Sequence, residues 1–398
     1  MVARNARLYG VYIVSQYTPL YWAYMYFLVT ETRGFSATDF GLLKAIYYLS
    51  VCLLEIPLGV LADRIGRRPA LVAAAGLNSL GCFLYVLATD FATFALAELC
   101  FAFSMALFSG AASALLYDSL ASESRQAHYL RIEGRARAAA LVATTLGLPL
   151  TDLFLVGSGD PSPAYAVTGV IALVGVGSAL AMREPPRRRA ATARAIATGA
   201  FHDLAQTPAL VWLIAWGAAL FVMVRAANAF LFNPVLESAG VPVNAFGSVL
   251  ATIGLIAALF AWRADAMMSA RPTATLLALP LSLTAMFGLL PATSGAAAVA
   301  VLCAHALALG ALPVIVSALL NDRITNGERR ATLLSLESLL SRGLYGAAAL
   351  GLGWGLDRAG LSSMLLAVGA LGILPLALVG LVARKSGPTS ASTGTGAS

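Results

Sequence analysis

The sequence predicts an all-α integral membrane protein with twelve transmembrane helices in two six-helix pseudo-repeats. Three observations support this prediction. Hydrophobic residues make up 59% of the 398 residues and charged residues only 11%, long apolar runs recur along the chain, and short motifs return roughly 205 residues apart. A soluble globular protein carries about a quarter charged residues, so this chain has too few charges to cover a soluble surface of its size.

The apolar runs have the length of membrane-spanning helices. A helix needs about 20 residues to cross a bilayer core of ~30 Å, and runs such as 42–62 and 361–383 match this length. Transmembrane strands are excluded, because a barrel alternates apolar with polar residues and these runs are apolar on all sides. The expected spans are 8–30, 40–62, 69–89, 92–117, 135–157, 163–182, 208–232, 244–262, 273–291, 296–320, 333–356 and 361–383.

The cysteines and the N-terminus narrow the class further. All four cysteines lie inside apolar runs without close pairing, so we expect buried apolar side chains rather than a disulfide framework or a metal site. Arg4 and Arg7 precede the first apolar run, but no small-residue cleavage site follows, so this run is expected to be a retained span. No metal and no cofactor is expected.

The distribution of basic residues predicts the topology. All but five of the 26 Lys and Arg residues fall in the N-terminal segment, the even-numbered loops or the C-terminal segment. The exceptions are Arg33 and Arg358 in the other loops and Lys44, Arg225 and Arg342 within spans. Because cytoplasmic loops are enriched in Lys and Arg, we expect a multi-pass protein of the plasma (inner) membrane with both termini in the cytoplasm. The net charge of +7 follows from this topology, and no nucleic-acid partner is expected.

An internal repeat divides the chain into two halves. The matching pairs are 34–41 with 240–247, 115–118 with 319–322, and Asp152 with Asp357. The three pairs share nearly one offset and fall at equivalent helix ends, which predicts a parallel six-plus-six repeat. The expected organisation is a six-helix bundle at 1–183, a basic cytoplasmic linker at 184–207, a second bundle at 208–384 and a disordered tail at 385–398. Such repeats place a substrate site near the midplane between the halves.

A signature sequence stands between the second and third spans. Residues 59–69 read GVLADRIGRRP, which resembles the G-x-L-A-D-R-x-G-R-R signature of the major facilitator superfamily, at the loop where that superfamily carries it. The resemblance implies the fold of that superfamily, a transport function and a loop that holds the two halves together at the cytoplasmic face. Gly59 and Gly66 have no side chain, so they permit a tight turn and close helix approach.

The resemblance also implies roles for the charged residues of this loop. Asp63 would be the acid of a cytoplasmic latch. Its implied basic partners are Arg64, Arg67 and Arg68. Asp118, at the end of the fourth-span motif, is assigned to the same gating set. Arg342 in the eleventh span is expected to face the signature loop.

Further motifs resemble a bacterial branch of drug or metabolite efflux transporters, among them residues 55–57 and 109–110. Two departures put the familiar antiport route of that branch in doubt. Residues 105–108 contain no arginine where drug antiporters often carry one, and only 147–149 remains of their glycine-rich run in the fifth span.

Ionisable residues inside the spans are candidates for proton coupling, because a charge in the bilayer core is costly. Glu55 is either a proton carrier or a gate residue bonded to a neighbouring helix. His305 is either a packing residue or a switch, since its unperturbed pKa is near neutral. Glu98 is the third candidate, and it could pair with Lys44 or with Arg225.

Candidate residues for a substrate cavity come from the first and seventh spans. Arg225 either extends to the outer interface or lines the cavity, where it would receive an anionic substrate or pair with an acid. Asn228 lies on the same face, three residues later. Gln16, Tyr17 and Tyr21 either line one face of the cavity or pack between helices. Aromatic walls suit flat or cationic organic molecules.

Together these features predict a secondary active transporter that exports a small organic molecule by alternating access, through proton-coupled antiport. The alternative is a proton-coupled importer, a symporter of a small metabolite. The expected partners are the small-molecule substrate, protons and the lipid bilayer, and the protein is expected to act as a monomer. No G-x-x-x-x-G-K-[S/T] loop occurs, so ATP is not the expected direct energy source. An enzyme is not expected, because the three histidines lie far apart and no catalytic set clusters in the sequence.

Overall fold

The computed structural model describes residues 2–121, 128–156, 159–184, 208–323 and 327–385. Within these ranges the chain is helical and forms no strand, which confirms the predicted all-α class. The predicted linker at 184–207 and the predicted tail at 385–398 lie outside the described residues, apart from Glu184 and Lys385.

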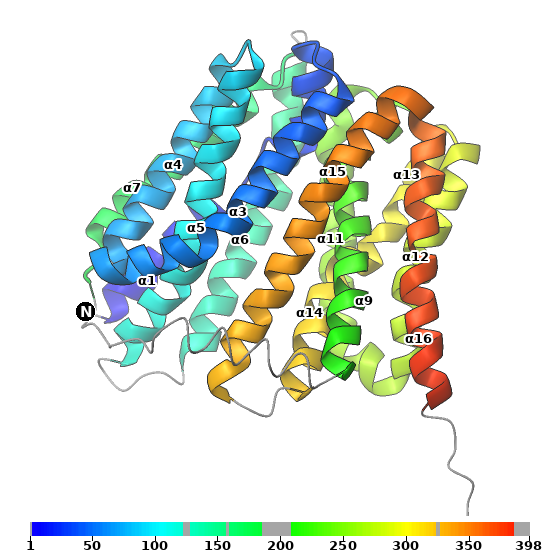
Figure 1. The fold of residues 1–398 in the computed structure, drawn as a ribbon. Helices are drawn as coiled ribbons and strands as arrows, with labels where there is room; N and C mark the ends of the chain where they lie inside the picture. Colours follow the sequence, from blue (N-terminus) through cyan, green and yellow to red (C-terminus); the bar gives the residue numbers. More distant parts are fainter. Residues whose placement is uncertain (1, 122–127, 157–158, 185–207, 324–326, 386–398) are drawn as a thin grey trace, which may run out of the picture.

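The helices follow one another as two comparable sets (Figure 1). The first set is α1 (Val2–Gln16), η1 (Trp22–Tyr24), α2 (Met25–Phe27), η2 (Leu28–Thr32), α3 (Ala37–Ile65), α4 (Arg67–Leu87), α5 (Phe91–Ala121), α6 (Tyr129–Asp152), η4 (Leu153–Leu155) and α7 (Ser162–Ala181). The second set is α9 (Pro208–Arg225), η5 (Ala226–Phe230), α10 (Phe232–Ser238), η6 (Val243–Ala245), α11 (Phe246–Ala270), α12 (Pro272–Leu289), η7 (Leu290–Ala292), α13 (Gly295–Leu302), η8 (Cys303–His305), α14 (Ala306–Arg323), α15 (Gly327–Leu371) and α16 (Ile373–Lys385).

Ten helical stretches of the described chain are long and apolar enough to cross a membrane. One of them, Leu336–Val379, has 44 residues and bends at Gly360, where φ is 75°. It therefore covers most of both of the last two predicted spans, 333–356 and 361–383. The first predicted span is not among the ten, because it is broken into shorter helices. The helices are consistent with twelve crossings.

The first span differs from the single helix that residues 8–30 suggested. α1 ends at Gln16, and the chain turns through residues 17–21 before η1 begins. Pro19 causes the break, because proline has no N–H to donate and its ring clashes with the carbonyl one turn earlier. The hydroxyl of Thr18 donates to the carbonyl oxygen of Val14 at 2.6 Å and so satisfies one acceptor of the interrupted turn.

The seventh and tenth spans are irregular as well. α9 ends at Arg225 and widens into the π-helical turn η5, and the short 3-10 turn η8 separates α13 from α14. Irregular backbone at membrane depth is tolerated where it is buried in protein or lines a cavity. The breaks in the first and seventh spans lie beside a cavity, because residues of both spans line the cavity described below.

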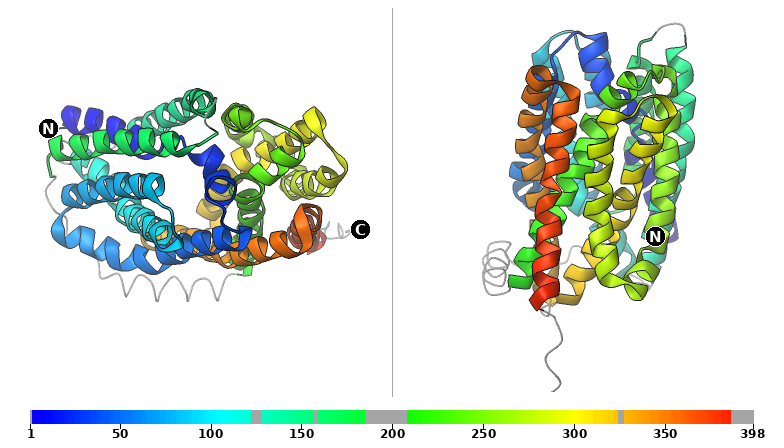
Figure 2. Two further views of the ribbon diagram at one scale, coloured as in Figure 1. Left: turned by 90° about the horizontal axis from the view of Figure 1, so that it is seen from above. Right: turned by 90° about the vertical axis from the view of Figure 1, so that its right-hand side faces the viewer.

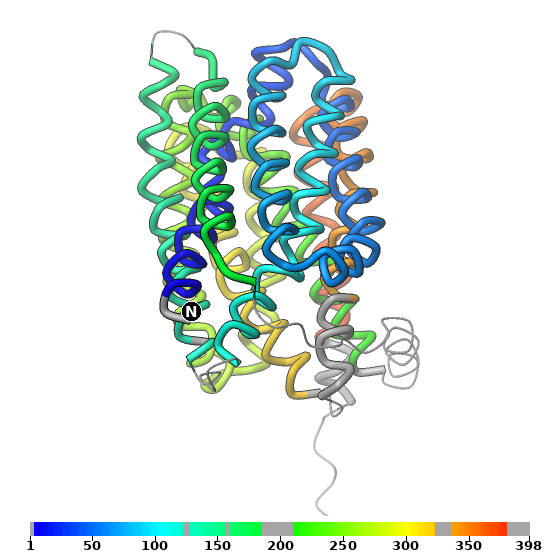
Figure 3. Tube along the Cα trace, turned by 90° about the vertical axis from the view of Figure 1, so that its left-hand side faces the viewer, coloured from blue at the N-terminus to red at the C-terminus, as the bar shows by residue number. Residues whose placement is uncertain are grey.

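The two halves pack through repeat-related pairs of helices. α3 packs along α15, and α6 packs along α11. α3 and α11 are the second spans of their halves and α6 and α15 the fifth, so the same contact occurs twice. Seen from above, the helices of the two halves occupy opposite sides of the molecule (Figure 2). α1 begins and α16 ends at the same end of the bundle (Figures 1 and 3).

Two repeat-related glycines permit a close approach of the halves. A Cβ at Gly41 would lie 2.4 Å from the carbonyl oxygen of Ala349, and a Cβ at Gly247 would lie 2.3 Å from that of Leu148. Atoms cannot approach so closely, so a larger residue at either position would push the paired helices apart. These glycines close the matching stretches 34–41 and 240–247, and the sequence repeat there reflects this packing requirement.

Candidate substrate cavity and gates

A cavity of about 450 Å³ opens between the halves, at the break in the first span. Its size lies in the range of small-molecule sites. The first half contributes most of the wall, and Arg225 and Ala229 come from the second half. The lining residues are Gln16, Tyr17, Pro19, Tyr21, Trp22, Met25, Lys44, Tyr47, Tyr48, Asn78, Tyr85, Glu98, Phe101, Ser104, Met105, Phe108, Arg137, Ala140, Leu141, Thr144, Tyr165, Arg225 and Ala229.

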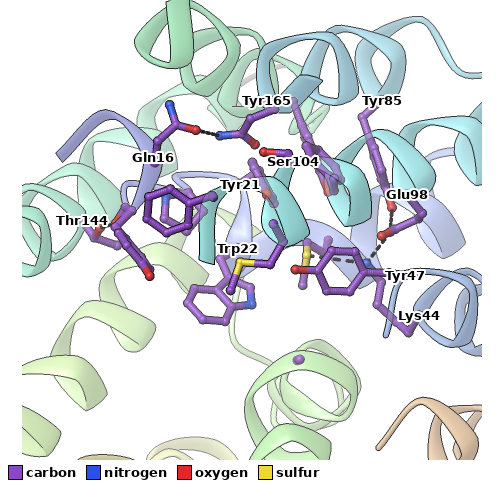
Figure 4. A pocket seen from close by; sticks show the side chains of 18 of the residues that line it. Gln16, Tyr21, Trp22, Lys44, Tyr47, Tyr85, Glu98, Ser104, Thr144 and Tyr165 are labelled. Carbon is purple, nitrogen blue, oxygen red and sulfur yellow. Dashed lines mark hydrogen bonds and ion pairs between the residues drawn. The ribbon is translucent and has the colours of Figure 1, made fainter. Parts of the chain in front are cut away.

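Stacked aromatic rings form one wall of the cavity (Figure 4). The ring of Tyr165 lies between those of Tyr21 and Tyr85, with centroids 4.3 Å and 4.6 Å away and nearly parallel planes. Phe101 packs beside this stack, with its ring centroid 5.9 Å from that of Tyr21 and 5.8 Å from that of Tyr85. Rings held in this way give the cavity a rigid apolar surface suited to a flat organic group.

A buried ion pair lies in the same wall. The ammonium of Lys44 lies 2.5 Å from the carboxylate of Glu98, and the two side chains are only 6% and 2% exposed. Tyr85 donates a second hydrogen bond to the same oxygen of Glu98. Of the two pairings that the sequence left open for Glu98, the structure shows the one with Lys44. Breaking such a buried pair leaves one charge uncompensated, which is costly.

Arg225 also lines the cavity, at the point where α9 gives way to η5. Its guanidinium lies over the rings of Trp22 and Phe221, 5.4 Å and 5.3 Å from their centroids. No carboxylate in the described ranges lies within ion-pair distance of Arg225, in contrast to Lys44. Of the two positions weighed for Arg225, the structure shows the cavity and not the outer interface.

The predicted residues of the first span also reach the cavity. Gln16 accepts a hydrogen bond from the amide of Asn78 at 3.0 Å. The hydroxyl of Tyr17 accepts one from Arg137 at 3.3 Å, and Arg137 is in turn paired with Glu133 at 2.7 Å. The roles of Gln16, Tyr17 and Tyr21 in binding stay predictions, but all three lie where a bound molecule would touch them.

At the end of the bundle predicted to be outer, two aspartates join the halves. Asp152, at the end of α6, accepts hydrogen bonds from the backbone N–H groups of Gly247 and Ser248 in the first turn of α11, both at 2.8 Å. Asp357 in α15 accepts them from Ala37 and Thr38 in the first turn of α3, at 3.0 Å and 2.8 Å. Each carboxylate caps the free N–H groups and the positive dipole end of a helix from the other half.

Asn233 in α10 adds a third contact between the halves at this end. Its amide donates to the carbonyl oxygen of Ala23 at 2.7 Å and accepts from the N–H of Phe27 at 2.9 Å. It thereby pairs two backbone groups that the broken first span leaves without helical partners. Hydrogen bonds from three side chains thus join the two halves at this end.

At the opposite end, the signature loop makes its contacts within its own half. Arg67 is paired with Asp118 of α5, and the N–H groups of Arg67 and Arg68 both donate to Glu184 at 2.7 Å. Gly66 has φ 108°, a value that favours glycine, so the tight turn expected there is present. A Cβ at Gly59 would meet open space, so the close helix approach expected at Gly59 is not made here.

The latch residues are not joined in this conformation. Asp63 and Arg64 are exposed, and within the described residues Asp63 makes no ion pair. Arg67 and Arg68 therefore have partners other than the acid that the resemblance implied. The expectation for Arg342 also needs correction, since its guanidinium lies 3.6 Å from the carboxylate of Glu55 and not at the signature loop. The reason is depth, because Glu55 precedes Asp63 by two helical turns.

Two predicted residues lie away from the cavity lining. His305 is fully buried in η8, and its Nδ1 lies 2.5 Å from the carbonyl oxygen of Leu302. Asn228 is 5% exposed within η5, one turn beyond Arg225. Neither residue reaches the cavity that Glu98 and Arg225 line.

Three further polar residues line the cavity, although the sequence did not mark them as candidates. Tyr85, Asn78 and Ser104 lie in apolar spans and were not singled out. Their polar groups within apolar spans could have identified them as candidates, because a hydroxyl or amide at membrane depth needs a hydrogen-bond partner. The partner of Tyr85 is Glu98, and that of Ser104 is the carbonyl oxygen of Ala74.

The comparisons with known proteins agree with this architecture. The sequence profile of the Major Facilitator Superfamily matches residues 12–349. The chain belongs to this superfamily. No curated protein matches the chain.

Solved structures of superfamily-type transporters show the same fold. The nucleoside transporter NupG matches with a TM-score of 0.78 at 12% identity, over 96% of this chain and 98% of that one. A bacterial homologue of the human lysosomal transporter Spinster, in an inward-facing and unoccupied conformation, matches at 0.73 and 18%, over 96% of both chains. A POT family transporter in complex with 5-aminolevulinic acid matches at 0.73 and 13%, over 97% and 96%.

These identities are low, so the likeness shows the fold alone. Superfamily membership and the transporter fold together identify a multi-pass membrane transporter and not an enzyme. As in other transporters built from parallel repeats, the cavity of this superfamily member lies where its two halves meet.

Proposed function

We propose that this protein is a secondary active transporter that moves a small organic molecule across the plasma membrane by alternating access, with the proton gradient as its energy source. It acts as a monomer with both termini in the cytoplasm. The observation that carries the proposal is a cavity between the two halves with a buried ion pair, Lys44 and Glu98, in its wall.

The contacts between the halves support a state in which the cavity is closed to the outside. Asp152, Asp357 and Asn233 join the halves at the predicted outer end, whereas Asp63 of the cytoplasmic latch is exposed. Transport would require these outer contacts to open while the latch forms at the other end. The fold shared with an inward-facing Spinster homologue is in keeping with this assignment.

Glu98 is the proton site best supported by position. Of the three candidates it alone lines the cavity, and it is held by Lys44 and Tyr85. A proton on Glu98 would remove the negative charge and leave the Lys44 ammonium without a partner at membrane depth. The protonation state of Glu98 therefore changes the charge that the cavity presents to a substrate, which is what coupling requires.

Two directions of transport fit this scheme. Export by antiport is favoured by the motifs at 55–57 and 109–110, which resemble an efflux branch. Import by symport is favoured by a specific observation in the cavity: Met105 and Phe108 line it in the stretch of the fourth span where drug antiporters often carry an arginine.

Proton movement in proteoliposomes tests the proposal. The purified protein would be reconstituted with a pH-sensitive dye inside and challenged with a panel of lipophilic cations and small organic acids. We expect a proton flux triggered by at least one compound, opposite to the compound for antiport and alongside it for symport. Equilibration of labelled compound through the protein with no proton flux would contradict the proposed coupling.

A further inference from the structure

The charges that line the cavity do not balance. Lys44 is compensated by Glu98 and Arg137 by Glu133. Arg225 alone among the lining cations has no carboxylate partner in the described part of the chain. A lone guanidinium in a cavity at membrane depth is a marker of a binding function, because its charge is costly there unless something pairs with it.

The surroundings of Arg225 leave its N–H edge available. Trp22 and Phe221 lie over its guanidinium at 5.4 Å and 5.3 Å from their ring centroids. Contacts of this kind hold the guanidinium plane in place without using its donors. The planar array of N–H donors matches the two oxygens of a carboxylate, sulfonate or similar anion.

We propose that the substrate is an organic anion with a flat aromatic group, whose anionic end pairs with Arg225 and whose ring packs against the aromatic wall. This inference rests on the proposed transport function and names its substrate class. The wall supplies Trp22, Tyr47 and the stack of Tyr21, Tyr165 and Tyr85. An organic cation of the same shape is disfavoured, because Arg225 would repel it.

The inference also links the substrate to the proton. When Glu98 is charged, Lys44 is paired with it and Arg225 is the available cation. When Glu98 accepts a proton, the ammonium of Lys44 becomes a second cation in the same cavity. An anion then binds more strongly to the protonated cavity, and the bound proton is in turn stabilised by the anion. Proton and anion would travel together, which favours symport over antiport.

A matched set of compounds tests the substrate class: naphthalenesulfonate, the neutral naphthalenesulfonamide and the naphthylmethylammonium cation. Binding to the full-length protein in lipid nanodiscs would be measured by calorimetry. We expect the sulfonate to bind about ten- to hundredfold more tightly than the sulfonamide, and the ammonium compound not to compete with it. Arg225→Gln is expected to remove the preference for the sulfonate, and Arg225→Lys to retain part of it.

Arg263→Gln is the matched control, because Arg263 also lies over a tryptophan, Trp262, but is exposed and outside the cavity. Its binding should equal that of the unmodified protein. Tighter binding of the ammonium compound, or an unchanged preference in Arg225→Gln, would overturn the anion assignment. Proton flux driven by the ammonium compound would also overturn the anion assignment, but it would support the proposed transport function. Sulfonate binding that depends on Arg225 without any proton flux would uphold the anion site and refute the coupling.

Discussion

Replacing Glu98 by Gln is expected to abolish substrate-driven proton flux. The amide cannot carry the proton, and it leaves the Lys44 ammonium, 6% exposed, without its carboxylate. Loss of one partner of a buried ion pair costs about 3–5 kcal/mol, so the variant should also melt at a lower temperature in detergent. Proton flux and thermal melting are measured on the same preparations.

A double variant separates the two effects. Lys44→Met with Glu98→Gln removes both charges, so stability should recover while proton flux stays absent. Glu31→Gln is the control, because Glu31 is an exposed carboxylate outside the cavity. Full proton flux in Glu98→Gln, together with its loss in Glu55→Gln, would move the proton site to the ion pair of Glu55 with Arg342.

Asn substitutions at Asp152 and Asp357 are expected to open the outer end. Each carboxylate holds two N–H groups of a helix from the other half, and an amide offers one neutral acceptor oxygen in its place. The ratio of outward-open to outward-closed molecules should rise about tenfold or more. The effect should be larger at Asp152, which is 5% exposed, than at Asp357, which is exposed.

Leu87 and Ser238 are exposed residues at the ends of α4 and α10, on the side predicted to be outer. Spin labels at these two positions would report the opening as a longer distance. Asp90→Asn is the matched control. Asp90 makes the same kind of cap, with the N–H of Thr93 at 2.9 Å, but within one half. An unchanged distance distribution in the Asp152→Asn variant would show that the cap does not hold the outer end closed.

Properties set by local sequence were predictable. Span positions follow from runs of apolar residues, and the family follows from the signature at 59–69, because both are read along the chain. The repeat was also visible, and the offset between Asp152 and Asp357 identified two residues with equivalent contacts. Their role as caps was not predicted, since it depends on which helix of the other half begins beside each carboxylate.

Pairings across helices were harder to predict. The sequence predicts Lys44 as one of two possible partners of Glu98, and the structure shows this pair. It also predicts Arg342 at the signature loop, but Arg342 lies beside Glu55. The rotation of a helix about its axis decides such pairings, and apolar runs contain little information about it. Breaks in spans also shift side chains, as Pro19 does for the residues that follow α1.

The most direct test of the central claim, proton coupling at Glu98, is the accumulation of labelled naphthalenesulfonate in proteoliposomes that are acidic outside. The sulfonate stays charged and crosses lipid poorly, so its entry reports the protein. The account predicts accumulation above the external concentration, collapse of the accumulation with a protonophore, and no accumulation in Glu98→Gln. The same internal level with and without the pH gradient would contradict it.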